Sequence, residues 1–287
     1  MPSKTILNFL SAFDFRLTSE SGAEYSYYEA LPKKQEMGSP TTISNASPTQ
    51  GGCRMEMISP ATDRQVARAM PAPKTALVHE TPEMYQAVTE IIIASICNSG
   101  SLSWIKNVVE GKKEVERLLV NHEDFILNID TKWKSHPDPL STPRSEWYQH
   151  SAIADLYCLG IVKQSGLRSL RDLRGEHIPL LTAMAKEGMV AIKKIYGLES
   201  SQIRIFVHYQ PQFYHFHVHF TRLENEVGCA VEKGHLVSDI VQNLDMDSDY
   251  YTKRTISFRL RTTDNLYKKL SETTASKISI KDNMEME

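Results

Sequence analysis

The chain has 287 residues, with 33 Lys and Arg against 35 Asp and Glu, a formal net charge of −2 and 41% hydrophobic residues. This near-neutral charge excludes a protein that binds long nucleic acid through many phosphate contacts, because such binding needs a strongly basic surface. Four widely spaced cysteines without a CxxC pair exclude a disulfide scaffold and favour a reducing compartment. No run approaches the ~20 apolar residues of a membrane helix, so we expect a soluble intracellular protein without a membrane partner.

Two segments of unusual composition divide the chain. Residues 33–54 are rich in Ser, Thr, Pro, Gly and Asn, which is typical of a flexible loop or insertion. Residues 134–146 contain three prolines, which remove backbone donors and predict a hinge. We therefore expect a partly flexible segment at 1–54, a first domain at 55–133, the hinge at 134–146 and a second domain at 147–287.

Helical spacing of apolar residues predicts a helix over 82–98 and a second over 102–110 that ends at Gly111. Residues 114–120 and 125–130 then predict two strands joined by a short polar turn. In the second half, amphipathic patterns predict helices over 147–162 and 179–196, and Gly197 follows as a C-terminal glycine. Alternating patterns predict strands over 202–208 and 213–220, followed by a helix over 231–243 and a closing strand over 255–260. The predicted fold class is α+β.

Four of the ten histidines fall within twelve positions: His208, His215, His217 and His219. If residues 213–220 form a strand, His215, His217 and His219 share one face, and Tyr214, Phe216, Val218 and Phe220 point into a core. Neighbouring histidines on that face would lie roughly 6.5 to 7 Å apart, a spacing that suits an elongated anion.

Two other interpretations of these histidines stay open. The triplet could be an accident of a polar strand face, although three adjacent imidazoles would lose hydration and repel one another when charged. It could also bind zinc, since two histidines two positions apart on a strand can share a metal. However, no carboxylate or thiol stands beside the triplet as a further ligand.

The segment His-Phe-His-Val-His-Phe at 215–220 fits the histidine triad pattern, in whose superfamily the middle histidine is the nucleophile. Together with four further segments, the chain resembles the scavenger mRNA decapping enzyme family from about residue 58 to residue 270. These segments are GLRSLRDL at 166–173, EHIPLL at 176–181, VEKGHL at 231–236 and YTKRTISFRLR at 251–261. The resemblance implies a C-terminal histidine triad domain and an N-terminal α+β domain whose strands are exchanged in a homodimer. Only the first 50 or so residues match poorly.

The resemblance implies a hydrolase that acts on an acid anhydride, the triphosphate bridge of the m7GpppN cap. Its substrates would be the cap dinucleotide or short capped mRNA fragments left by 3′-to-5′ decay, in the cytoplasm and also the nucleus, and its products m7GMP and a nucleoside diphosphate. His217 would attack the phosphorus next to the methylguanosine and form a phosphohistidine that water then hydrolyses. Its attacking nitrogen must be unprotonated, with the other nitrogen donating to an acceptor such as a backbone carbonyl. No metal or other cofactor is expected, because the histidines would supply positive charge and donors.

By family position, a set of side chains around His217 would contact the phosphates or orient the nucleophile. Lys233 stands where the family usually has arginine, and Arg68 aligns with a family lysine. Gln212 and Phe213 stand where the family commonly has serine and tyrosine. The complete predicted phosphate-contacting set is His208, Gln212, Phe213, Tyr214, His215, His219, Lys233 and Arg68.

Recognition of the methylated base would fall to the first half of the chain. Trp104 matches the family's stacking aromatic, and a desolvated indole on the cationic base gains about 1 to 2 kcal/mol of cation–π energy. Glu114 matches the carboxylate that accepts hydrogen bonds from guanine. In one unbroken helix these two residues would lie ~15 Å apart, so the hypothesis requires Gly111 to end the helix.

Asp130 and Lys132 match a family Asp-x-Lys-Trp element and would hold the ribose or base edge and a phosphate. Before them, Ile129 replaces a usual proline and Asn128 replaces a usual apolar residue. Taken singly, these base-recognition residues have ordinary explanations. Trp104 could be a core residue, Glu114 could lie on a solvated face, and Asp130 with Lys132 could be an exposed strand end.

Alternative functions also stay open. One is another dinucleoside polyphosphate or nucleoside phosphoramidate hydrolase of the same superfamily. Another is a catalytically silent cap-binding protein, and the last is a metal-dependent enzyme.

Overall fold

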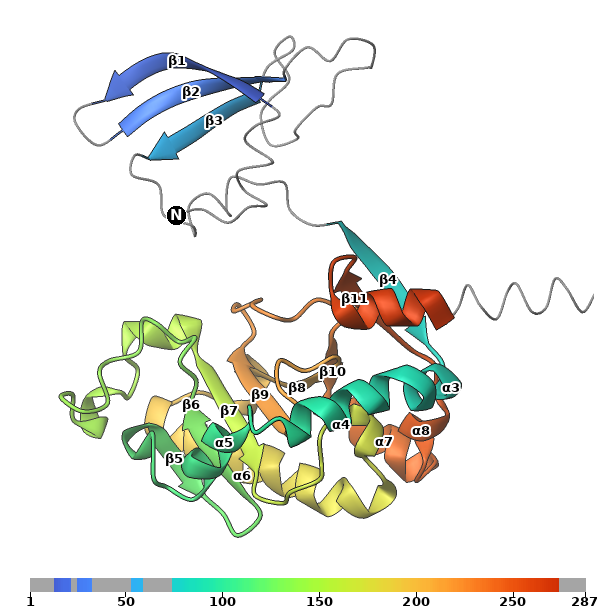
Figure 1. Ribbon diagram of the computed structural model, residues 1–287. Coiled ribbons are helices and arrows are strands. Elements are labelled where there is room, and N and C mark those ends of the chain that lie inside the picture. Colours follow the sequence, from blue (N-terminus) through green and yellow to red (C-terminus); the bar gives the residue numbers. More distant parts are fainter. Residues whose placement is uncertain (1–12, 22–24, 33–52, 59–73, 274–287) are drawn as a thin grey trace, which may run out of the picture. The chain divides into compact units, whose positions relative to one another are not determined.

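The computed structural model describes residues 13–21, 25–32, 53–58 and 74–273. It divides the chain into two compact units, Met1–Lys74 and Thr75–Glu287. In the first unit, three antiparallel strands lie in the order β1-β2-β3 (Figure 1). These strands are β1 (Phe13–Ser21), β2 (Tyr25–Pro32) and β3 (Cys53–Ile58). Most of the predicted loop, residues 33–52, lies outside the described residues, as does Arg68.

A six-stranded antiparallel sheet forms the centre of the second unit, in the order β10-β8-β9-β7-β6-β5. Its strands are β5 (Leu118–Asn121), β6 (Phe125–Ile129), β7 (Tyr157–Val162), β8 (Ile203–His208), β9 (His217–Arg222) and β10 (Gly234–Leu236). A separate antiparallel pair joins β4 (Thr75–Glu80) to β11 (Ile256–Arg261). The predicted α+β class is confirmed in this unit.

The helices of the second unit begin with a continuous stretch of α3 (Pro82–Met84), a π-helical turn at Tyr85–Thr89, and α4 (Glu90–Asn98). The remaining α-helices are α5 (Ser103–Val109), α6 (Ile178–Tyr196), α7 (Val237–Met246) and α8 (Tyr250–Lys253). The helices predicted over 82–98, 102–110 and 179–196 are therefore confirmed. Within the described residues, no single helix is long and apolar enough to cross a membrane. One pair bent by 68°, Pro82–Asn98 with Ser103–Val109, passes the same test of length and composition together.

The predicted domain boundary at 134–146 differs from the observed division. This segment connects β6 to β7, and those strands pair in antiparallel register from Phe125↔Val162 to Ile129↔Cys158. The prolines therefore interrupt local structure inside one continuous sheet, and the compact units divide between Lys74 and Thr75 instead. Local composition marks where regular structure stops, but it does not show that the strands on either side pair with each other.

The helix predicted over 147–162 is wrong. The structure has 3₁₀ turns at Arg144–Glu146 and Ser151–Asp155, followed by strand β7. All six residues of β7 are buried, and a strand buried on both faces is a continuous apolar run that helical periodicity cannot distinguish from a helix. Three other elements start late. Strand β5 begins at Leu118 rather than residue 114, because Val115–Arg117 form a 3₁₀ turn. Strand β9 begins at His217 rather than residue 213, and α7 begins at Val237 because residues 234–236 pair with β8.

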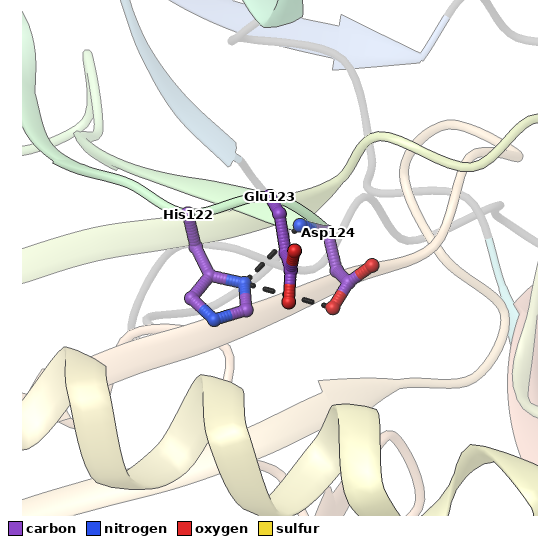
Figure 2. Close-up of side chains that lie close together, drawn as sticks. All are labelled: His122, Glu123 and Asp124. Carbon is purple, nitrogen blue, oxygen red and sulfur yellow. Dashed lines mark hydrogen bonds and ion pairs between the residues drawn. The ribbon is translucent and has the colours of Figure 1, made fainter.

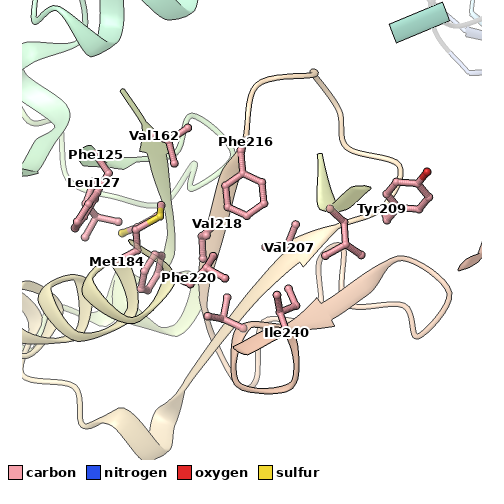
Figure 3. Packing of buried hydrophobic residues seen from close by; sticks show 14 of the residues in the cluster. Phe125, Leu127, Val162, Met184, Val207, Tyr209, Phe216, Val218, Phe220 and Ile240 are labelled. Carbon is pink, nitrogen blue, oxygen red and sulfur yellow. The ribbon is translucent and has the colours of Figure 1, made fainter. Parts of the chain in front are cut away.

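The sheet has a packed layer on each face. On one face, side chains of α6 and α7, including Met184 and Ile240, meet alternate residues of the strands, including Leu127 and Phe220 (Figure 3). On the other face, Ile105 and Val108 of α5 pack with a smaller apolar cluster from β6 and β7. His217 and His219 project from β9 on this second face, opposite to Val218, so α5 and the histidines share one side of the sheet.

Candidate functional site

His217 and His219 are the two buried histidines of β9, with 2% and 1% of their surface exposed and ring centres 5.0 Å apart. His215 does not share their strand, because β9 begins two residues later. Instead, His215 Nε2 donates to the carbonyl oxygen of Val162 at 2.7 Å. The predicted three-histidine strand face is thus corrected to two strand histidines and one preceding residue that is anchored to β7.

The hydrogen bonding of His217 leaves one of its nitrogens available for attack. Its Nδ1 lies 2.7 Å from the carbonyl oxygen of His215, and since a carbonyl only accepts, Nδ1 carries the proton. Burial lowers the pKa of His217 to about 3, and the nearby charge of Lys132 acts in the same direction. Nε2 therefore keeps its lone pair at neutral pH. A backbone acceptor for the other nitrogen was expected from the sequence, and this contact confirms it.

Two further imidazoles surround His217. His219 has Nδ1 at 3.0 Å from the Tyr157 hydroxyl, and burial holds its pKa well below the usual range. His208 packs on His219 with ring centres 4.1 Å apart and donates from Nε2 to the carbonyl oxygen of Gly228 at 2.8 Å. Burial, with a smaller contribution from Lys233, lowers the pKa of His208 to about 4.

The source of positive charge in the site therefore differs from expectation. The resemblance implied that the histidines supply it, but His208, His217 and His219 are all held neutral by burial. The cations that act on this cluster are Lys132 and Lys233, and each lowers the pKa of the histidines. In this site, the imidazoles offer lone pairs and N–H donors, while the lysines offer charge.

Aromatic rings connect His217 to α5. Phe213 stacks on His217 with ring centres 4.0 Å apart and planes 18° apart. Trp104 meets Phe213 edge-on, with ring centres 5.1 Å apart, and is 39% exposed. Trp104 is thus not a core residue, and it lines a pocket.

That pocket has a volume of about 150 Å³ and collects predicted residues from five parts of the chain. The predicted residues that line it are Trp104, Glu114, Asp130, Lys132, Gln212, Phe213, His217 and His219. The remaining lining residues are Val108, Asn128, Ile129, Thr131, Leu159 and Ile161. Four predicted residues do not line this pocket: His208, Tyr214, His215 and Lys233. Of these, His208 packs against His219, which does line it. Arg68 lies outside the described residues.

The chain reversal after α5 brings Glu114 to the pocket. Helix α5 ends at Val109, and Gly111 follows with φ +67°, a backbone angle that residues other than glycine rarely adopt. Glu114 itself has φ +56°, and desolvation by burial raises the pKa of its carboxyl group. The required break between Trp104 and Glu114 is therefore present.

Asp130 and Lys132 occupy the turn after β6. Asp130 Oδ1 accepts a hydrogen bond from the Lys132 backbone N–H at 2.7 Å. The Lys132 ammonium nitrogen lies 5.2 Å from the ring centre of Tyr157, whose hydroxyl meets His219. This turn therefore holds a cation beside the histidines without pairing it to Asp130.

Comparisons with known proteins agree with this arrangement. Residues 103–235 match the family model described as scavenger mRNA decapping enzyme C-term binding. The m7GpppX diphosphatases of Mus musculus and Homo sapiens are each 32% identical over 253 residues, which cover 86% of the chain and 65% and 66% of those proteins. That of Ascaris suum is 33% identical over 218 residues, or 74% of the chain and 66% of that protein. The chain belongs to the scavenger mRNA decapping enzyme family. It spans just under two thirds of the length of these relatives.

Three residues of this family member's site escaped the sequence analysis. Tyr157 was hidden in the wrongly predicted helix, and Gly228 lies in a loop without a recognisable motif. Gly228 has φ +81°, and a Cβ there would lie 2.9 Å from His208 Nε2, so its glycine allows His208 to reach the carbonyl. Asn128 was noted only as a departure from the family pattern.

Within the described residues, one group of side chains has metal-ligand atoms within 4.8 Å of one another: His122, Glu123 and Asp124. Figure 2 shows it at the turn between β5 and β6. His122 Nδ1 already accepts from the Asp124 backbone N–H at 3.1 Å, and both carboxylates are exposed. The group contains none of the four clustered histidines, so it has no part in the site described above.

Proposed function

We propose that the chain hydrolyses the triphosphate bridge of m7GpppN caps and releases m7GMP and a nucleoside diphosphate. The observation that carries this proposal is the neutral His217, with Nδ1 bonded to a carbonyl and Nε2 free, at a pocket also lined by Trp104 and Glu114. Further support comes from relatives named m7GpppX diphosphatase. The substrates would be the cap dinucleotide and short capped fragments from 3′-to-5′ decay.

In the first step, the lone pair of His217 Nε2 forms a bond to the phosphorus next to the methylguanosine. The bond from that phosphorus to the bridging oxygen breaks, and its electrons leave with the nucleoside diphosphate. The phosphorylated imidazole becomes cationic, and its Nδ1–H bond to the carbonyl of His215 strengthens, because charged donors bond more tightly. Water then attacks the phosphorus, the electrons of the P–N bond return to Nε2, and one proton of the water passes to the solvent as m7GMP is released.

Charge on the phosphates would be met by the two lysines. Lys132 lines the pocket, and Lys233 acts electrostatically on His208 and His219. Burial and the charge of Lys132 lower the pKa of Lys233, so an arriving phosphate is a favourable partner for it. The histidines would donate N–H groups to the transition state rather than charge.

Choice of the methylated base would depend on Trp104 and Glu114. The partly exposed indole in the pocket lining can stack on a cationic base, a contact of about 1 to 2 kcal/mol when desolvated. Glu114 would accept from the base edge, and its desolvated carboxylate also favours a positive ring.

The family resemblance also supports a histidine triad fold for the sheet, a homodimer with exchanged N-terminal strands, and a location in the cytoplasm and the nucleus. The dimer is tested by light scattering of the purified chain during size-exclusion chromatography: a monomer mass would contradict it.

The function is tested with the purified full chain, m7GpppG and GpppG, in the presence of EDTA. We expect m7GMP and GDP as products, and a rate about tenfold higher for the methylated cap, which corresponds to the cation–π contact. Absence of m7GMP, or equal rates for the two caps, would contradict the proposal. Comparable hydrolysis of adenine dinucleotides would favour another hydrolase of the superfamily, and tight binding without turnover would favour a silent cap-binding protein.

A further inference from the structure

Asn128 is a buried polar residue whose side-chain oxygen has no partner in the described part of the chain. It lies on β6, is 4% exposed, and lines the pocket beside Val108 and Leu159. Among the described residues, its Oδ1 has no hydrogen-bond donor. An unsatisfied buried carbonyl of this kind destabilises the free protein, because it has lost its hydrogen bonds to water. An apolar side chain would pack at this buried position without that cost.

The position of Asn128 relates it to the base end of the site. The strand register Asn128↔Leu159↔His219 puts it in the same cross-strand row as His219, two strands away, or about 10 Å. Asn128 and Ile126 alternate with the core residues of β6, so they face α5, the helix that carries Trp104. Trp104 and Glu114 line the same pocket. The orphan oxygen therefore lies among the residues proposed to hold the base, at a distance from the nucleophile.

Guanine presents one more donor than Glu114 can accept. Its Watson–Crick edge carries the N1–H and the exocyclic 2-amino group, which has two hydrogens. A carboxylate accepting side by side takes N1–H and one amino hydrogen. The second amino hydrogen, once removed from water, needs another acceptor or costs binding energy.

Resting on the proposed function, we propose that Asn128 Oδ1 accepts this second hydrogen and makes the chain specific for a base with a 2-amino group. Binding would then satisfy two groups at once, the amino hydrogen of the ligand and the orphan oxygen of the protein. The cost of the buried amide in the free protein becomes a source of discrimination in the complex.

The test measures Kd by calorimetry in the full chain carrying His217→Asn, which prevents turnover. The ligands are m7GpppG and its 7-methylhypoxanthine counterpart, m7IpppG, which lacks only the 2-amino group on the methylated base. Asn128→Leu should raise the Kd for m7GpppG about tenfold and the Kd for m7IpppG less than twofold. Equal weakening of both ligands, or of neither, overturns the inference. If the His217→Asn chain with Asn128 intact does not bind m7GpppG, it is the proposed function that fails.

A second measurement separates recognition from a purely structural role. Because Asn128→Leu removes an unsatisfied buried atom, the unliganded variant should have an unchanged or higher Tm. A lower Tm would mean that the amide has a partner in the free protein, which contradicts the inference. The matched control is Asn121→Leu on the neighbouring β5, whose exposed Oδ1 accepts from Lys163 Nζ at 2.8 Å. That control should leave the Kd for both ligands unchanged.

Discussion

The buried ion pair between Glu80 and Arg171 should be a main determinant of the stability of the second unit. Glu80 is 0% and Arg171 2% exposed. Arg171 donates from Nε and Nη2 to Glu80 Oε2 at 3.2 and 3.0 Å, and from Nη1 to the carbonyl of Tyr251 at 2.9 Å. Tyr209 and Thr89 also donate to the carboxylate. One guanidinium from the GLRSLRDL segment thus joins β4, α8 and the residue that follows β8.

Replacing Arg171 with Met leaves a buried carboxylate without its cation and removes the donor to the Tyr251 carbonyl. Breaking a buried pair in this way costs about 3 to 5 kcal/mol. Since Tyr209 and Thr89 still donate to Glu80, we expect a loss at the lower end of this range, about 3 kcal/mol. That is a large part of the free energy of unfolding of a typical protein, about 5 to 15 kcal/mol. The assay is urea unfolding of the full chain, with the free energy taken by linear extrapolation.

The matched control is Lys193→Met, which breaks an ion pair of similar length, 2.9 Å to Glu199, between side chains that are 62% and 58% exposed. Exposed pairs contribute less than about 1 kcal/mol, so this variant should unfold almost like the wild type. The double variant Glu80→Gln, Arg171→Met should recover part of the loss, because it removes the unpaired charge. The reasoning is refuted if Arg171→Met costs no more than Lys193→Met.

Two further predictions concern the histidines. Burial lowers the pKa of His235 to about 4, so between pH 6.5 and 4 the unfolded chain binds a proton that the folded chain does not. The free energy of unfolding therefore decreases as the pH falls, by up to about 1.4 kcal/mol per pH unit. In urea unfolding, His235→Asn should lose less stability than the wild type from pH 7 to pH 5, and an equal loss would contradict this. Gly228→Ala should lower kcat at least tenfold, because the new Cβ would lie 2.9 Å from His208 Nε2. The control is Gly166→Ala, where φ is +90° and a Cβ would meet no atom within 4 Å, so this variant should have similar backbone strain and an unchanged kcat. Equal kcat values for the two variants would contradict a role for the His208 contact.

The sequence predicted the candidate site better than the course of the chain between its residues. Trp104, Glu114, Asp130, Lys132 and His217 all line one pocket, because the family resemblance carries spatial information that periodicity lacks. Local patterns also predicted α6, whose apolar stripe and terminal Gly197 are independent of distant partners. Strand β7 was missed because burial on both faces depends on layers contributed by other parts of the chain.

Charge was the other feature that the sequence could not predict. From the sequence alone, clustered histidines suggest a cationic site. Their protonation, however, depends on how much water the fold removes from each ring. Burial is the largest cause of the lowered pKa at His208, His217 and His219 alike. The packing that removes this water comes from Phe213 before β9 and Phe206 on β8, which stack on His217 and His219.

The central claim, that His217 is the nucleophile, is tested most directly by comparing wild type with His217→Asn in two measurements, one with the substrate m7GpppG and one with m7GMP. One is the single-turnover rate of m7GMP release, and the other is the Kd for m7GMP, the expected product. Asparagine keeps a polar side chain but has no imidazole nitrogen to bond phosphorus. The account predicts loss of turnover by at least a thousandfold, about 4 kcal/mol, with Kd changed less than threefold. Turnover by His217→Asn within tenfold of wild type would contradict it.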